Sequence, residues 1–289
     1  MEKRLNKKSL YADLSLLLVA AIWGSGFVVT KNAVNHITPF YMLAIRFFIS
    51  FILMAIIFWE RVKNTKLKDI KAGAVIGFFL FTAFATQTYG IKYTTVSKQA
   101  FITASNVVMV PFFYWFVSKK KPEPYEIMSA IICFIGIGIL SIEKGFRIGL
   151  GDSLTLLCAV FFASHIVSIG IFAEDHDPIL LTIYQMFIAA IFSLVSAIIF
   201  EPKIPILTKE IIFPVLYLSI FSTLIAFLVQ NLAQKHTSST KAAIILSTEA
   251  LFGSLFSFVF LKEPFSLKFL VGCSAILFSI INTETKLQL

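Results

Sequence analysis

Long blocks of apolar residues, separated by short polar connections, are the dominant pattern along the 289-residue chain. Blocks of about 18–22 residues match transmembrane helices, because a hydrocarbon core roughly 30 Å thick needs about 20 helical residues at 1.5 Å each. The pattern predicts an all-α integral membrane protein with ten transmembrane helices. We expect these spans near residues 14–31, 40–59, 70–88, 98–116, 125–142, 153–172, 179–200, 211–231, 241–261 and 266–283.

Composition agrees with this pattern. The chain is 58% hydrophobic and 14% charged, which is far less charge than a soluble domain needs. The first block is too long for the apolar core of a signal peptide and is followed by no small-residue cleavage site, so we expect it to remain as the first span. The connections are too short to hold a soluble domain.

The positive charges are distributed unevenly between alternate connections. If the N-terminus lies inside, fifteen Lys and Arg residues flank the spans on the inner side and nine on the outer side, while Arg46 lies within a span. The positive-inside rule then places both termini in the cytoplasm and the protein in the cytoplasmic membrane. Because the cations are loop flanks, in contact with membrane lipids, rather than one basic face, they argue against nucleic acid as a partner.

The two halves of the chain share a polar pattern. Residues 39–48 (PFYMLAIRFF) align with residues 178–187 (PILLTIYQMF), 139 positions later, and residues 87–106 align with residues 230–249, 143 positions later. Five spans in each half is an odd number, so the halves must cross the membrane in opposite senses. The pattern predicts two inverted five-helix repeats around a central cavity, residues 1–145 and 146–289, the plan of many secondary transporters.

The same residues resemble a known family. Several short motifs follow one another along the chain: WGSGFVVTK (residues 23–31), Pro39 with Arg46-Phe47, GIKYTTVSKQAFI (90–102), Pro111, GDSL (151–154), AQKHTSSTKAAII (233–245), STEALFG (247–253), LKEP (261–264) and Gly272. Their order and duplication give the chain a resemblance to EamA-type members of the drug/metabolite transporter superfamily. It implies a membrane carrier, and many members of the family export amino acids or other small metabolites.

Glu249 is the polar residue that most needs an explanation, because it lies about 12 Å inside the ninth predicted span. A carboxylate facing lipid would cost about 2.5–3.5 kcal/mol, so we expect it to face the bundle interior. Burial favours the neutral acid, which would let this group gain and lose a proton near neutral pH. Gln185 and His165 fall at a similar depth, and the repeat places Gly26, Arg46 and Asn106 in a mirrored outer layer.

The candidate substrate or coupling site consists of Glu249, His165, Gln185, Arg46 and Asn106, with Trp23, Tyr184 and Ser25 beside them. An aromatic wall near a carboxylate would suit a cationic or zwitterionic solute. Structural roles remain alternatives: Glu249, His165, Gln185 and Asn106 could tie helices together, Arg46 could reach the outer surface, and Ser25 could serve close helix packing.

We therefore expect a secondary active transporter that moves a small polar metabolite, plausibly an amino acid or related zwitterion, by alternating access. Export and proton coupling through Glu249 are favoured, with import or exchange of another metabolite, drug or lipid-like solute as the alternative. A membrane enzyme is the least favoured class, since the chain has no HExxH, GxSxG or P-loop motif. We expect no cofactor and no metal: the three cysteines are isolated, and EDHDP (residues 174–178) is expected to be a solvated acidic turn.

Overall fold

The computed structural model describes residues 7–94, 96–141, 149–201, 203–206, 208–261 and 267–285, and all regular structure in them is helical. The first half contains α1 (Lys7–Ala33), α2 (Pro39–Ile57), α3 (Trp59–Lys63), α4 (Leu67–Gly90), α5 (Val96–Ala104), α6 (Asn106–Ser118) and α7 (Pro124–Ser141). The second contains α8 (Leu150–Asp175), α9 (Pro178–Phe200), α10 (Lys209–Tyr217), the π-helix η1 (Leu218–Ile225), α11 (Ala226–Gln234), α12 (Ser239–Leu246), α13 (Glu249–Leu261) and α14 (Leu267–Thr285).

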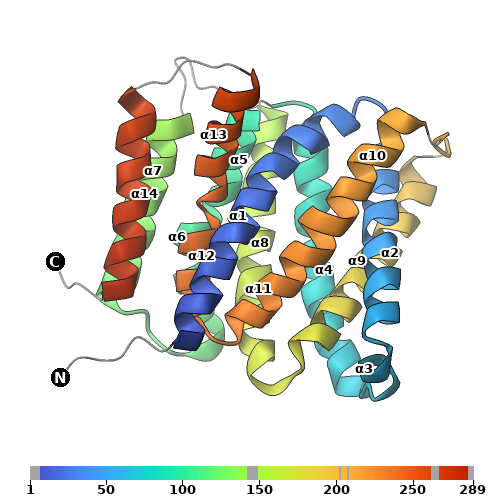
Figure 1. The fold of residues 1–289 in the computed structure, drawn as a ribbon, viewed down its shortest axis with the longest axis horizontal. Helices are drawn as coiled ribbons and strands as arrows, with labels where there is room; N and C mark the ends of the chain where they lie inside the picture. The colour runs from blue at the N-terminus through green and yellow to red at the C-terminus, as the bar shows by residue number, and fades with distance from the viewer. Residues whose placement is uncertain are drawn as a thin grey trace.

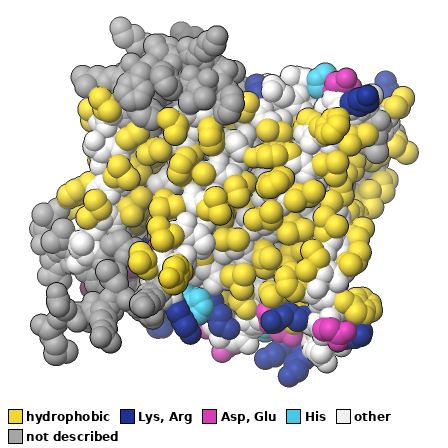
Figure 2. All heavy atoms as spheres, in the orientation of Figure 1, with side chains coloured by type: hydrophobic (Ala, Val, Ile, Leu, Met, Phe, Trp, Pro, Cys, Tyr) yellow, Lys and Arg dark blue, Asp and Glu magenta, His cyan; other side chains and the backbone are white. Residues whose placement is uncertain are grey.

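The long helices lie side by side and run up and down between two faces of the molecule, with α1 beginning and α14 ending on the lower side of Figure 1. Seven helical segments in the described residues are long and apolar enough to cross a membrane, and Pro124–Ile139 and Leu270–Thr283 are shorter apolar helical stretches. Apolar side chains cover the middle of the visible surface and charged ones gather along its lower edge (Figure 2). The predicted all-helical integral membrane protein is confirmed.

Some residues used in the sequence analysis fall outside this description. They are Lys3, Arg4, Thr95, Lys144, Arg147, Lys262, Glu263, Pro264 and Lys286, together with the side chains of Lys7, Ser97, Lys98, Leu261 and Lys268.

Helix starts follow ordinary capping chemistry. Proline occupies the first position of both α2 and α9, where its missing N–H is not needed. The Asp177 carboxylate accepts a hydrogen bond from the Ile179 N–H at the start of α9, at 2.9 Å. The start of α2 is capped from a distance, because the Glu201 carboxylate accepts hydrogen bonds from the Phe40 and Tyr41 N–H groups at 3.1 Å.

Two of the predicted spans are broken in the middle. The segment predicted at residues 98–116 is interrupted at Ser105, between α5 and α6, and the segment predicted at 241–261 is interrupted at Ser247 and Thr248, between α12 and α13. At each break the serine or threonine hydroxyl donates to a carbonyl oxygen three residues earlier, at 2.6–2.7 Å. Irregular backbone within a membrane is tolerated where it is buried in protein or lines a cavity, and the breaks place Asn106 and Glu249 first in α6 and α13.

Helix boundaries recur between the halves at the spacings seen in the sequence. Both ends of α13 lie 143 positions after those of α6, and α12 and α14 begin 143 positions after α5 and α7. The start of α9 lies 139 positions after that of α2. The similarity therefore extends from residue types to the places where helices begin and break.

Glycine allows the closest helix approach beside the broken segment. A Cβ atom added at Gly24 of α1 would lie 2.8 Å from the Gly253 nitrogen and 2.9 Å from the Glu249 carbonyl oxygen of α13. Only a residue without a side chain lets the two helices pack this closely. The contact fixes the first turn of α13, and with it Glu249, against α1.

Candidate functional site

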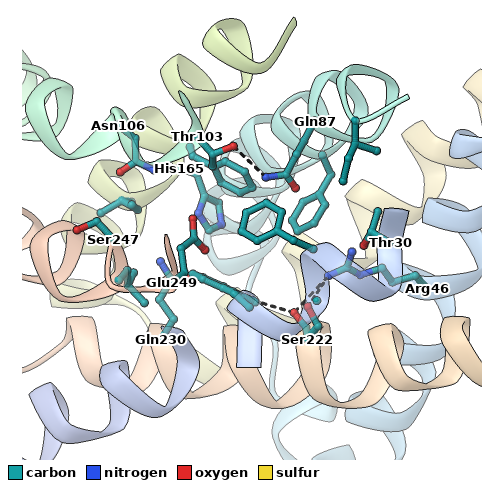
Figure 3. Close-up of a pocket in the computed structure, with 18 residues that line it drawn as sticks. Thr30, Arg46, Gln87, Thr103, Asn106, His165, Ser222, Gln230, Ser247 and Glu249 are labelled. Atoms are coloured by element: carbon teal, nitrogen blue, oxygen red, sulfur yellow. Dashed lines mark hydrogen bonds between the residues drawn. The ribbon is translucent and has the colours of Figure 1, made fainter. Parts of the chain in front are cut away.

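A small cavity lies in the interior of the bundle, where helices from both halves meet (Figure 3). Its volume of about 50 Å³ is enough for a few water molecules and small beside the roughly 300–1,000 Å³ of most ligand pockets. In this conformation the space is therefore narrow. It is lined by Trp23, Gly26, Phe27, Thr30, Arg46, Phe84, Gln87, Ile91, Thr103, Asn106, Phe162, His165, Ile166, Ser222, Gln230, Leu246, Ser247 and Glu249.

Two thirds of these lining residues form pairs related by the spacing of the repeat. Three pairs are 139 positions apart and three are 143 positions apart: Trp23 with Phe162, Gly26 with His165, Phe27 with Ile166, Gln87 with Gln230, Thr103 with Leu246, and Asn106 with Glu249. Positions separated by 139 or 143 residues in the two halves of the chain thus line one cavity. The chemistry of the pairs is unequal, because the ionisable members, His165 and Glu249, both come from the second half.

Glu249 points into the cavity from the first turn of α13 and is 7% exposed (Figure 3). No described residue donates a hydrogen bond to its carboxyl group, although Gln230 and His165 line the cavity beside it. Buried polar groups normally have partners. Glu249 therefore has its hydrogen-bonding capacity free for a solute, a water molecule or a proton.

His165 lines the cavity and is held by Gln185, which does not line it. The His165 Nε2 and Gln185 Oε1 atoms are 2.9 Å apart, and the Phe227 ring contacts the imidazole edge to face. The Nδ1 atom of His165 and the Nε2 atom of Gln185 are buried with no protein partner among the described residues. The two predicted residues are thus in contact, whereas no hydrogen bond joins His165 to Glu249.

Arg46 lies on the other side of the cavity, fixed to the π-helix. Its Nε–H group donates to the Thr223 hydroxyl, and its Nη2 group donates to the Ser222 hydroxyl at 3.1 Å and to the Ser222 carbonyl oxygen at 3.3 Å. The guanidinium lies 4.4 Å from the centroid of the Phe84 ring. It is 2% exposed, so it does not reach the outer surface. No described carboxylate forms an ion pair with it.

The remaining predicted residues divide into two groups. Asn106 and Trp23 line the cavity, and the Trp23 Nε1–H group donates to the Ser222 carbonyl oxygen at 3.0 Å. Tyr184 and Ser25 do not line it: the Tyr184 hydroxyl donates to the Thr65 hydroxyl at 2.9 Å, and the Ser25 hydroxyl lies 2.5 Å from the Tyr217 hydroxyl. Both belong to helix contacts outside the cavity.

Six polar lining residues were not singled out from the sequence: Thr30, Gln87, Thr103, Ser222, Gln230 and Ser247. Gln87 and Gln230 begin the two aligned segments of the repeat, so the alignment carried a signal for them. Ser222 had none, because it lies in the π-helix η1, which the apolar pattern of the sequence does not reveal. In η1 the Thr223 hydroxyl donates to the Leu218 carbonyl oxygen five residues earlier, at 2.7 Å. Insertions of this kind are frequent at functional sites.

The acidic turn EDHDP is engaged in contacts between helices. The His176 Nδ1 atom lies 2.7 Å from an Asp69 carboxylate oxygen, and Asp177 caps α9 and accepts a hydrogen bond from Arg61. In the part of the chain that the structure describes, no three His, Cys, Asp or Glu residues are grouped so as to hold a metal ion.

The fold and the cavity together define an all-helical integral membrane protein. Polar residues from both halves of its chain line one internal cavity. Comparison with known sequences gives the family. The EamA-like transporter family pattern matches residues 10–142 and again residues 149–283. The chain belongs to the EamA-like transporter family.

Relatives along nearly the full length are transporters of unassigned substrate. The chain is 37% identical over 274 residues to an uncharacterized transporter of Archaeoglobus fulgidus, covering 95% of this chain and 86% of that protein. It is 25% identical over 284 residues to the uncharacterized transporter YvbV of Bacillus subtilis, covering 95% and 92%. A solved crystal structure with 16% sequence identity superposes with a TM-score of 0.78 over 96% of each chain, which shows a shared fold. This is a membrane transporter.

Proposed function

We propose that the protein is a secondary active transporter that moves a small polar metabolite by alternating access of the central cavity to the two sides of the cytoplasmic membrane. The observation that carries this proposal is the cavity itself, which is lined by six pairs of residues from the two halves at the spacings of the proposed repeat. In transporters built from inverted repeats, the substrate site lies near the bilayer midplane at the repeat interface.

The proposed architecture is ten spans in two inverted five-helix repeats. Two observations support it: the family pattern matches twice, and helix boundaries, including the breaks in the proposed fourth and ninth spans, recur at spacings of 139 and 143 positions. In this arrangement α5 with α6 forms the fourth span, α10 with η1 and α11 the eighth, and α12 with α13 the ninth. Both termini lie in the cytoplasm by the positive-inside rule.

The cavity chemistry favours a zwitterion such as an amino acid. A carboxyl group without a protein donor, that of Glu249, lies on one side, and the Arg46 guanidinium, without an ion-pair partner among the described residues, lies on the other (Figure 3). The aromatic rings of Trp23, Phe84 and Phe162 line the space as well. An ammonium group would be attracted to the acid and to aromatic faces, and a carboxylate to the guanidinium.

Glu249 is the proposed coupling group. A buried carboxyl group that no protein donor stabilises can exchange a proton for a cationic substrate group, which would link outward substrate movement to inward proton movement. Export as the direction rests on the resemblance to metabolite exporters of the same family.

The test is uptake by the purified full-length protein in proteoliposomes. A panel of labelled amino acids and other small metabolites is presented with and without an imposed pH gradient. We expect at least one zwitterionic solute to accumulate more in protein-containing than in protein-free vesicles, with the pH gradient increasing the accumulation. Transport confined to apolar drugs or lipids would contradict the proposed substrate class.

A further inference from the structure

A second concave site lies on the side of the bundle and is independent of the central cavity. It is a groove of about 620 Å³ between α4 and α6, with α8 as its floor. Val75 and Phe79 of α4 form one wall, and Phe113, Phe116 and Val117 of α6 form the other. Its lining is almost wholly apolar, which suits a hydrocarbon chain rather than a polar solute.

The floor of this lateral groove is apolar although it contains two serines. The Ser164 hydroxyl donates to the Val160 carbonyl oxygen at 3.0 Å, and the Ser168 hydroxyl donates to the Ser164 carbonyl oxygen at 2.7 Å. Both hydroxyls are thus turned back onto α8, and Phe172 completes the floor. From Ser164 to Phe172 the floor covers about 12 Å along the helix axis. One leaflet supplies about 15 Å of hydrocarbon, so the groove matches the depth of one leaflet.

The groove has a polar end and an apolar end. On α4 the residue one turn before Val75 is Lys71, and on the other wall Val117 is followed, after Ser118, by Lys119, Lys120 and Lys121. All four lysines are exposed. Because α4 begins on the lower face of Figure 1 and α6 ends there, the lysines of both walls flank the same end of the groove.

Lys119 has an unusual backbone conformation and lies at the rim of the groove. It has a left-handed backbone conformation (φ 59°), the only positive φ among the described residues other than glycine, and it ends α6. This conformation is uncommon for a residue with a side chain. The Lys119 Nζ atom lies 4.9 Å from the Phe116 ring centroid, which places its charge over the rim of the groove. Two exposed acidic residues, Glu174 and Asp175, follow Phe172 on the floor helix, so the four lysines of the walls outnumber the acidic residues at this end of the groove.

We propose that this groove is a binding site for an anionic phospholipid, whose acyl chain lies between α4 and α6 and whose phosphate head group contacts Lys119 and Lys120. The lipid comes from the leaflet on the side where α1 begins. Basic residues at a membrane surface attract anionic lipids, and a fitted apolar groove at the same end retains one of them. This proposal does not rest on the transport proposal, because it uses none of the cavity residues.

The experiment measures which lipids remain bound to the purified full-length protein. Detergent-solubilised protein is incubated with equal amounts of phosphatidylglycerol and phosphatidylcholine of the same acyl chains, and retained lipid is counted by native mass spectrometry. We expect the intact protein to retain phosphatidylglycerol preferentially. The Lys119→Gln/Lys120→Gln variant should lose this preference by about fivefold for each lysine. The Lys63→Gln/Lys235→Gln variant, with the same charge change away from the groove, should keep it.

A third variant tests the groove itself. Ser168→Phe fills the floor without changing charge and should reduce retention of both lipids, while gel filtration and thermal unfolding report whether it is folded. Equal retention of the two lipids by the intact protein would overturn the proposal. So would equal losses in the two lysine variants, or full retention in a folded Ser168→Phe protein.

Discussion

At the scale of single residues, Arg46 and Glu249 line the same cavity but differ in their hydrogen bonds to the protein. Arg46 makes three hydrogen bonds to Ser222 and Thr223, whereas the Glu249 carboxyl group has no donor among the described residues. Arg46 anchors η1 through its Nε and Nη2 groups, and its Nη1 group makes no hydrogen bond to the described residues, which leaves it to attract a substrate anion. The Glu249 carboxyl group has no protein donor and can bind something that comes and goes, so we assign it the exchangeable role.

Arg46→Lys tests the anchoring. Lysine keeps the charge but cannot reproduce the planar fork that reaches Ser222 and Thr223 together. We expect a loss of about 1–3 kcal/mol in stability, visible as a lower midpoint of thermal unfolding in detergent. Arg61→Lys is the control, because Arg61 pairs with Asp177 at an exposed position, where such pairs contribute little. Equal shifts in the two variants would contradict the anchoring role.

At the scale of helices, close packing and local breaks position the site. Gly24 brings α1 against the first turn of α13, and the break at Ser247 and Thr248 places Glu249 at a helix start. On the Arg46 side of the cavity, the π-helix positions the Ser222 carbonyl oxygen, which accepts hydrogen bonds from Trp23 and Arg46. Asn106, Ser222, Ser247 and Glu249 therefore lie at breaks or in the π-helix, whereas Arg46, Gln87 and His165 lie within regular α-helices.

The contact between α1 and α13 is asymmetric, which gives a matched pair of substitutions. A Cβ atom at Gly24 would lie under 3.0 Å from three atoms of α13, whereas one at Gly253 would have its nearest neighbour, the Gly24 carbonyl oxygen, at 3.7 Å. We expect Gly24→Ala to cost about 1–3 kcal/mol through overpacking and to reduce transport, because Glu249 must move. Gly253→Ala should be tolerated. Thermal unfolding and proteoliposome uptake measure both effects, and a stable, active Gly24→Ala protein would show that this contact does not position the site.

The sequence predicted an all-helical membrane protein correctly, but it did not predict the breaks inside individual helices. Apolar block length identified the membrane helices, because burial in lipid demands about 20 apolar residues whatever their packing. The breaks at Ser105 and Ser247 and the π-helix at residues 218–225 were missed, because they depend on which carbonyl oxygen a hydroxyl group reaches, and hydropathy does not record this. The repeat alignment pointed to Asn106 and Glu249, yet Tyr184 and Ser25 were placed by neighbourhood in sequence, and their side chains turn to other helices.

At the scale of the whole molecule, both halves of the chain contribute residues to one cavity, and successive connections between long helices lie on opposite faces (Figure 1). The exposed Asn64, between α3 and α4, and the exposed Asn35, between α1 and α2, lie at opposite ends of α2. The positive-inside rule assigns the first to the cytoplasm and the second to the outside.

This orientation is tested by labelling with a membrane-impermeant thiol reagent. In a background without native cysteines, Asn35→Cys should react in intact cells, and Asn64→Cys should react only after the membrane is opened. The reversed pattern would invert the proposed topology, and reaction of both positions in intact cells would contradict the span between them.

The most direct test of the account is transport by the Glu249→Gln variant. This substitution keeps the size of the side chain but removes its ability to bind and release a proton. Wild-type protein in proteoliposomes should accumulate its substrate in response to a pH gradient, and should also exchange internal for external substrate without one. We predict that the variant keeps measurable exchange and loses the accumulation. A variant that accumulates substrate as well as the wild type would contradict the central claim that this buried acid couples transport to protons.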